Sequence, residues 1–371
     1  METVSAALIV RNEEFFLPDC LASLKGRVDE IVVVDTGSTD RTCDIATKAG
    51  AKVLDFPWVN DFAVARNAGL DHVTSSWVLY IDADERLVLP NGLRLASLLD
   101  HPEAIGARVK FRPISRGTPC FEYRFFRSRP DIRFVGAIHE TITPSLDRLC
   151  KDENWKIVNI DAELVHLGYE GDLTHKYQRN LPMLQRMVQE WPDRLYYWLD
   201  LAKALAGLGK KAEAREVCFI GLRKAEEQTS PSSRSIAALI ALTLTEILID
   251  ADEDASAIIQ QGLKFQSDHP SLLFQLARSH VKAGYHRDAI TILDHLIELG
   301  RKGYSDPLVS FDERIFGANA LELKSVALLR LGRRFEAGEC MQQASALEPL
   351  EMSYRVKATA LGARSYLGKN C

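Results

Sequence analysis

Short apolar runs alternate with amphipathic stretches over the first 100 residues. Four runs rich in β-branched residues end at polar or turn residues and predict strands, at 4–10, 30–35, 52–56 and 77–82. The stretches between and after them carry apolar residues at helical spacing, at about 14–25, 40–49, 60–73 and 90–99. This alternation predicts right-handed βαβ units and a mostly parallel sheet.

The pattern loosens between residues 105 and 170. The segments 106–113, 121–127 and 132–140 are predicted as further strands, some of them antiparallel. Four arginines in this region form a basic group that could guide an anionic ligand or simply line an exposed strand edge: Arg124, Arg127, Arg129 and Arg133.

After residue 172 the strand pattern gives way to internal repeats. Segments 195–228, 270–303 and 318–351 each place a glycine at a turn and an alanine five positions later, and 236–269 is a weaker copy. The spacing resembles tetratricopeptide repeats, with a generic helical bundle as the alternative. We therefore expect three parts: an α/β domain at 1–170, a connecting helix at 171–194 and a helical-repeat domain at 195–371.

The net charge and the cysteines limit the expected partners and the expected cellular compartment. The formal net charge of −5 argues against nucleic acid as a partner. The seven cysteines form no C-x-x-C pair, which favours a reducing, cytoplasmic compartment. We expect no signal peptide and no transmembrane segment, so that any membrane contact is peripheral.

Polar residues cluster where the predicted strands end. They follow the first, second and fourth strands, and the helix after the third strand adds more: Arg11–Glu14, Asp35–Asp40, Asp82–Glu85, and Asp61, Arg66 and Asn67. Open α/β sheets bind ligands at this edge. Because Asp82 and Asp84 are so close in sequence, their carboxylates repel each other unless a cation lies between them. Mg²⁺ or Mn²⁺, which also binds phosphate oxygens, suits such a site.

The motifs, taken in order, resemble glycosyltransferase family 2 with the GT-A fold. They are LIVRNEE, EIVVVDTGSTDRT, FAVARNAGL and WVLYIDADE. The later FFRSRPDIRFVGAIHE and HLGY are similar to the subgroup that includes the sublancin S-glycosyltransferase. The resemblance covers roughly residues 3–170.

The resemblance implies roles for the matching residues. Asn12 and Glu13 would lie by the nucleoside, and Asp35 would bind the base or ribose. Arg66 would approach the diphosphate or shape its pocket. Asp82 would contact the ribose or sugar, with Ala83 beside it in the nucleotide site. Asp84 would bind the metal, and His166 is the candidate for a further metal ligand.

Inversion at the anomeric carbon requires a base that deprotonates the acceptor. By resemblance the base is Glu140, with His139 as its rival, since histidine titrates in this pH range. The chain lacks the Q-x-x-R-W motif, which disfavours processive polysaccharide synthesis.

Together these features predict a metal-dependent, inverting glycosyltransferase. It would move a hexose or N-acetylhexosamine from a nucleotide sugar, with UDP as the expected nucleotide, to a peptide or protein side chain. A cell-envelope glycan or lipid acceptor is the first alternative, and a non-catalytic repeat scaffold is the second. The subgroup resemblance also suggests a homodimer.

Overall fold

The computed structural model divides the chain into two compact units. It describes residues 2–90, 93–113, 117–168, 173–306 and 309–362. The first unit comprises Met1–Ser115 and Pro119–Pro192, and the second comprises Asp193–Cys371 with a short segment that ends at Thr118. The boundary predicted at residues 170 and 171 lies outside the described residues.

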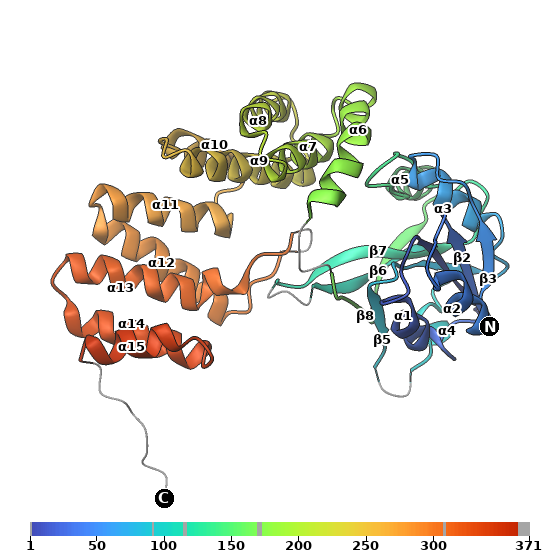
Figure 1. Ribbon diagram of the computed structural model, residues 1–371, viewed down its shortest axis with the longest axis horizontal. Coiled ribbons are helices and arrows are strands. Elements are labelled where there is room, and N and C mark those ends of the chain that lie inside the picture. The colour runs from blue at the N-terminus through green and yellow to red at the C-terminus, as the bar shows by residue number, and fades with distance from the viewer. Residues whose placement is uncertain (1, 91–92, 114–116, 169–172, 307–308, 363–371) are drawn as a thin grey trace, which may run out of the picture. The chain divides into compact units, whose positions relative to one another are not determined.

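An eight-stranded sheet organises the first unit, in the order β3-β2-β1-β4-β7-β6-β8-β5 (Figure 1). The first four strands in this order pair in parallel, and β7 then pairs antiparallel with both β4 and β6. At the far edge β8 is parallel to β6 and antiparallel to β5. The strands are β1 Val4–Val10, β2 Glu30–Asp35, β3 Lys52–Asp55, β4 Trp77–Tyr80, β5 Glu85–Val88, β6 Ala104–Pro113, β7 Cys120–Arg127 and β8 Lys156–His166.

Apolar cores cover both faces of this sheet. Along β4, Trp77 and Leu79 belong to one core and Val78 to the other, because successive strand side chains point to opposite faces. The first core includes residues of α1 and α4, and the second includes residues of α3 and α5. The helices of the unit are α1 Leu17–Leu24, α2 Thr42–Lys48, α3 Phe62–Leu70, α4 Leu95–Leu98, α5 Thr143–Asp152 and α6 Thr174–Glu190.

The predicted class, an α/β domain followed by helical repeats, is confirmed. One predicted strand is wrong, since residues 132–140 form a loop in which Val135 makes only a single bridge to Thr141. Gly136 and His139 have positive φ angles of 96° and 51°, which interrupt an extended strand.

The second unit is a series of antiparallel helix pairs followed by a single helix (Figure 1). Each helix packs against the next along the chain. The helices are α7 Leu195–Gly207, α8 Lys211–Ala225, α9 Pro231–Asp250, α10 Ser256–Phe265, α11 Pro270–Ala283, α12 His286–Arg301, α13 Ala318–Arg330, α14 Arg334–Leu347 and α15 Met352–Ala360. A 3₁₀ helix, η1 Glu313–Phe316, precedes α13.

Within the described residues, α9 alone is long and apolar enough to cross a membrane by length and composition. Half of its most apolar window is buried inside the protein, where α7, α8 and α10 contact it. The core helix of a helical domain has the same composition, so α9 is weak evidence for a membrane span.

A buried histidine begins α11. Nδ1 of His269 accepts a hydrogen bond from the backbone N–H of Leu272 at 3.3 Å, and the ring meets that of Phe311 edge-on, with 5.2 Å between centroids. Burial lowers the pKa of His269 to about 4, although Asp306 acts in the opposite direction. The folded protein therefore holds this imidazole neutral.

This pKa predicts an acid-sensitive second unit. Between about pH 6.5 and pH 4 the unfolded chain binds a proton at His269 that the folded chain excludes, so stability falls as the pH falls. The loss attributable to this side chain is on the order of 3 kcal/mol. We expect His269→Asn, which retains a capping acceptor but does not titrate, to flatten the pH dependence of the unfolding free energy over this range. Equal slopes for the two proteins in denaturant titrations would refute the assignment.

Candidate active site

The loops after β1 and β2 are joined by hydrogen bonds. Asn12 donates its backbone N–H to Ser38 Oγ at 2.9 Å and accepts from the backbone of Thr39 through Oδ1 at 2.8 Å. It adopts a φ of 56°, which asparagine tolerates better than most residues. The backbone N–H of Glu13 donates to Thr42 Oγ1 at 2.7 Å. These contacts join the two segments, and we call the residues that they connect the rim: Asn12, Glu13, Ser38, Thr39 and Thr42.

Asp35 ends β2 beside this rim. Its carboxylate accepts from the backbone N–H groups of Gly37 and Ser38 at 3.1 and 3.0 Å, and the residue is buried. Gly37 has a φ of 100°, a conformation that glycine reaches without strain. The turn thus fixes the carboxylate at the carboxyl end of the sheet, where the sequence places a nucleoside contact.

Arg66 on α3 connects two acidic residues that are distant in sequence. Its Nη2 donates to Asp82 Oδ1 at 2.8 Å, and its Nε donates to Glu140 Oε1 at 2.5 Å. The guanidinium also lies over the rings of Tyr80 and Phe134, 5.0 and 5.5 Å from their centroids. Only 7% of the Arg66 side chain is exposed, so both ion pairs are sheltered from water on the arginine side.

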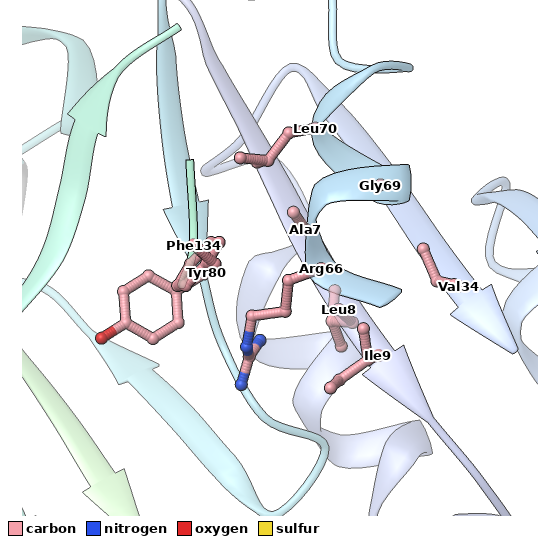
Figure 2. A pocket seen from close by; sticks show the side chains of 9 residues that line it. All are labelled: Ala7, Leu8, Ile9, Val34, Arg66, Gly69, Leu70, Tyr80 and Phe134. Carbon is pink, nitrogen blue, oxygen red and sulfur yellow. The ribbon is translucent and has the colours of Figure 1, made fainter. Parts of the chain in front are cut away.

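Figure 2 shows Arg66 reaching from α3 between two groups of side chains. The small hollow around its stem is mostly apolar and is lined by Ala7, Leu8, Ile9, Val34, Arg66, Gly69, Leu70, Tyr80 and Phe134. Because these neighbours are apolar, the guanidinium finds its hydrogen-bond acceptors in the two carboxylates. Burial alone would raise the pKa of Asp82, but Arg66 and then Arg124 outweigh it and hold that pKa below its usual range.

The loop that carries Glu140 is held against α3. The side-chain amide of Asn67 makes two hydrogen bonds with the backbone of Phe134, each 2.9 Å long. At the start of α3, the N–H of Phe62 donates to the carbonyl of Ala137 at 2.8 Å. These bonds satisfy backbone groups that a strand would have paired, and they bring Glu140 to Arg66. His139 is the neighbouring residue on the same loop.

Asp82, Ala83 and Asp84 lie in the tight turn between β4 and β5. The N–H of Asp82 donates to Glu85 Oε2 at 3.0 Å, and Arg86 donates to the carbonyl of Ala83 at 2.9 Å. Glu85 is buried and pairs with Arg124 through both carboxylate oxygens, at 2.8 and 3.0 Å.

The expectation that Arg124 guides a ligand or lines an exposed edge is therefore wrong. Arg124 is buried, and it fixes the turn through Glu85. Sequence reasoning missed this pair, although the acid directly follows the D-A-D motif.

Asp84 and His166 face each other at the edge of the turn. Their side chains approach to 3.1 Å between Asp84 Oδ2 and His166 Nε2, because β5 and β8 pair Glu85 with His166. The hydrogen bond to Asp84 raises the pKa of His166, with burial opposing it. A carboxylate and an imidazole at this spacing are ligand types suited to a divalent cation.

The charge around the pair also fits a cation. Burial, and then repulsion from Asp84, Asp82 and Asp40, raise the pKa of Glu13 to about 7. Within the described part of the chain no three His, Cys, Asp or Glu side chains already converge as a complete metal site. Asp84 and His166 would supply two ligands to a metal ion, and water or a bound phosphate would have to supply the others.

The N-terminal part of the chain, which carries Asp35, Arg66, Asp82 and Asp84, matches a known protein family. Residues 5–124 match the model of Glycosyl transferase family 2. A TPR repeat-containing protein of Synechococcus elongatus is 38% identical over 231 residues, which are 60% of this chain and 57% of that protein. The SPbeta prophage-derived glycosyltransferase SunS of Bacillus subtilis is 30% identical over 227 residues, which are 57% of this chain and 51% of that protein.

The chain thus spans little more than half the length of these curated relatives. Among solved structures, Staphylococcus aureus TarS 1–349 aligns at a TM-score of 0.37 and 15% identity, covering 72% of this chain and 91% of the other. The family match covers β1 to β4 and the turn that carries Asp82 and Asp84. Residues 5–124 of the first unit are therefore a stretch of glycosyl transferase family 2 sequence, and helical repeats follow in the second unit.

Proposed function

We propose that this chain is an inverting glycosyltransferase that uses a nucleotide sugar, with UDP as the nucleotide. The observation that carries the proposal is the joining of Asp82 and Glu140 by Arg66, beside the Asp84–His166 pair, in a family 2 domain. In this proposal the turn that carries Asp82 and Asp84 would bind the donor, and the loop that carries Glu140 would supply the base.

Asp84 and His166 would hold Mg²⁺ or Mn²⁺, which neutralises the charge that develops on the diphosphate leaving group. The raised pKa of Glu13 supports a cation in this region, because a positive charge would relieve the repulsion among the neighbouring carboxylates. Asn12, Glu13 and Asp35 border the same rim and would contact the nucleoside.

Glu140 would accept the proton of the attacking hydroxyl or thiol. Its ion pair with Arg66 fixes the carboxylate relative to Asp82, and one of its oxygens has no role in the 2.5 Å contact to Nε. A base must lie within hydrogen-bond reach of the acceptor when the donor is bound. His139 is adjacent on the loop, and variants must separate the two.

The acceptor we propose is a peptide or protein side chain. Stacked helix pairs such as α7–α8 and α9–α10 form extended surfaces suited to peptides. We propose a cytoplasmic location, because the seven cysteines of the chain form no C-x-x-C pair.

Asp84→Asn should abolish metal-dependent donor binding. The variant removes one anionic ligand, so we expect Mn²⁺ to lose most of its effect and the UDP dissociation constant to rise roughly tenfold or more. Calorimetric titration of UDP with and without Mn²⁺ measures both. Asp55→Asn, at the exposed end of β3, is the matched control and should bind like the unaltered protein. Unchanged metal dependence in Asp84→Asn would remove the metal role, and no UDP binding by the unaltered protein would remove the function.

Glu140→Gln should slow transfer without loss of donor binding. Glutamine keeps an oxygen that can accept from Arg66 but cannot take a proton, so we expect a loss of roughly 10²- to 10⁴-fold. Hydrolysis of UDP-sugars, in which water is the acceptor, provides an assay before the natural acceptor is identified. His139→Ala is the comparison, and we expect it to retain activity. An inactive His139→Ala with an unimpaired Glu140→Gln would exchange the two assignments.

A further inference from the structure

Helix α6 packs on the first turn of α3 through two arginines. The guanidinium of Arg179 lies over the ring of Phe62, 5.3 Å from its centroid. About two turns further along the same face of the helix, Arg186 lies 3.7 Å from the carboxylate of Asp61. Asp61 caps α3 by accepting from the backbone of Val64 at 3.0 Å. The helix therefore lies against the start of α3, which carries Arg66. It begins 50 residues after the end of the family match at residue 124.

Arg179 also interacts electrostatically with two charged residues that follow β1, Arg11 and Glu13. Burial and then repulsion from Arg11 lower the pKa of Arg179, while Glu13 opposes them. In return, Arg179 is the cation that opposes the raised pKa of Glu13. The guanidinium thus lies at the start of α3 and acts electrostatically on Arg11 and Glu13.

The charge of Arg179 is not neutralised by an ion pair. Its Nε donates to Asn180 Oδ1 at 3.0 Å, and within the described residues no carboxylate comes within ion-pair distance of it. Two other cations of the site, Arg66 and His166, already have carboxylate partners. Arg66 has two carboxylate partners, and His166 is paired with Asp84.

Two neighbouring guanidiniums repel each other unless an anion lies between them. Arginine binds phosphate through a planar fork of donors, and its two terminal nitrogens are the ones that this fork uses. Through Phe62, Arg179 lies at the start of α3, the helix whose Arg66 holds Asp82 two residues before Asp84.

We propose that Arg179, with Arg11, binds the diphosphate of the nucleotide donor, so that α6 completes the donor site from outside the region that the family model covers. The inference rests on the proposed function and names a residue for one part of it. Arg179 would bind the diphosphate in the substrate and stabilise its added charge as the sugar departs.

The test is a set of calorimetric titrations of the full chain with uridine, UMP and UDP in the presence of Mn²⁺. In Arg179→Gln we expect UDP to bind roughly 10- to 100-fold more weakly, the equivalent of one lost charged hydrogen-bonding group, and uridine to bind as before. Arg179→Lys should recover part of the loss. Arg186→Gln, on the same helix but paired with Asp61, is the matched control and should leave the ratio of UDP to uridine affinity unchanged.

Each outcome separates this inference from the function it rests on. If the unaltered protein binds UDP and Arg179→Gln binds it equally well, Arg179 does not contact the diphosphate and the proposed function still stands. If Arg179→Gln lowers the affinities for uridine and UDP equally, Arg179 only supports the structure of the site, and the inference is overturned. If the unaltered protein binds no nucleotide, the proposed function itself fails.

Discussion

A buried guanidinium must keep its carboxylate partners, and the candidate site is built on that constraint. Removing one partner from a buried ion pair leaves an uncompensated charge, which costs several kcal/mol. Arg66 has two carboxylate partners on different segments: Glu140, whose side chain is 12% exposed, and Asp82, whose side chain is 43% exposed and whose pair is weakened by water. The single side chain therefore fixes α3, the turn after β4 and the loop at 132–140 relative to one another.

The acidic character of the candidate site follows from this arrangement. Glu85 is neutralised inside the protein by Arg124, and Asp82 is held by Arg66, so both are used to fix the turn. Asp84 and Glu13 have no arginine partner of this kind. His166 lies beside Asp84, and repulsion from Asp84 helps to raise the pKa of Glu13. A site that has an excess of carboxylates at a sheet edge and an arginine on the opposite helix suits a divalent cation together with a diphosphate.

Local patterns made much of this readable from the sequence. The alternation of apolar runs gives β1 to β4, whose bounds differ from the predicted ones by no more than two residues. The D-A-D motif and the asparagine after β1 stand at strand ends, where chain order alone puts them at one edge. The helical repeats are readable because each copy reuses the same turn.

What the sequence could not reveal depends on contacts between distant segments. The partners of Arg66, Asp82 and Glu140, are 16 and 74 residues away in the sequence, so no local pattern could indicate that one guanidinium joins them. The loop at 132–140 has the composition of a strand, but α3 satisfies its backbone groups. Arg179 had no motif to mark it, since it sits in a helix with ordinary amphipathic spacing.

The central claim is that Arg66 and Glu140 act as one unit. A double-mutant cycle tests it directly, with the free energy of unfolding measured by denaturant titration for Arg66→Met, Glu140→Gln and the double variant. The account predicts that Arg66→Met is strongly destabilised and that adding Glu140→Gln costs little more, since the carboxylate has already lost its partner. Losses that simply add would contradict the account, because the two side chains would then be independent.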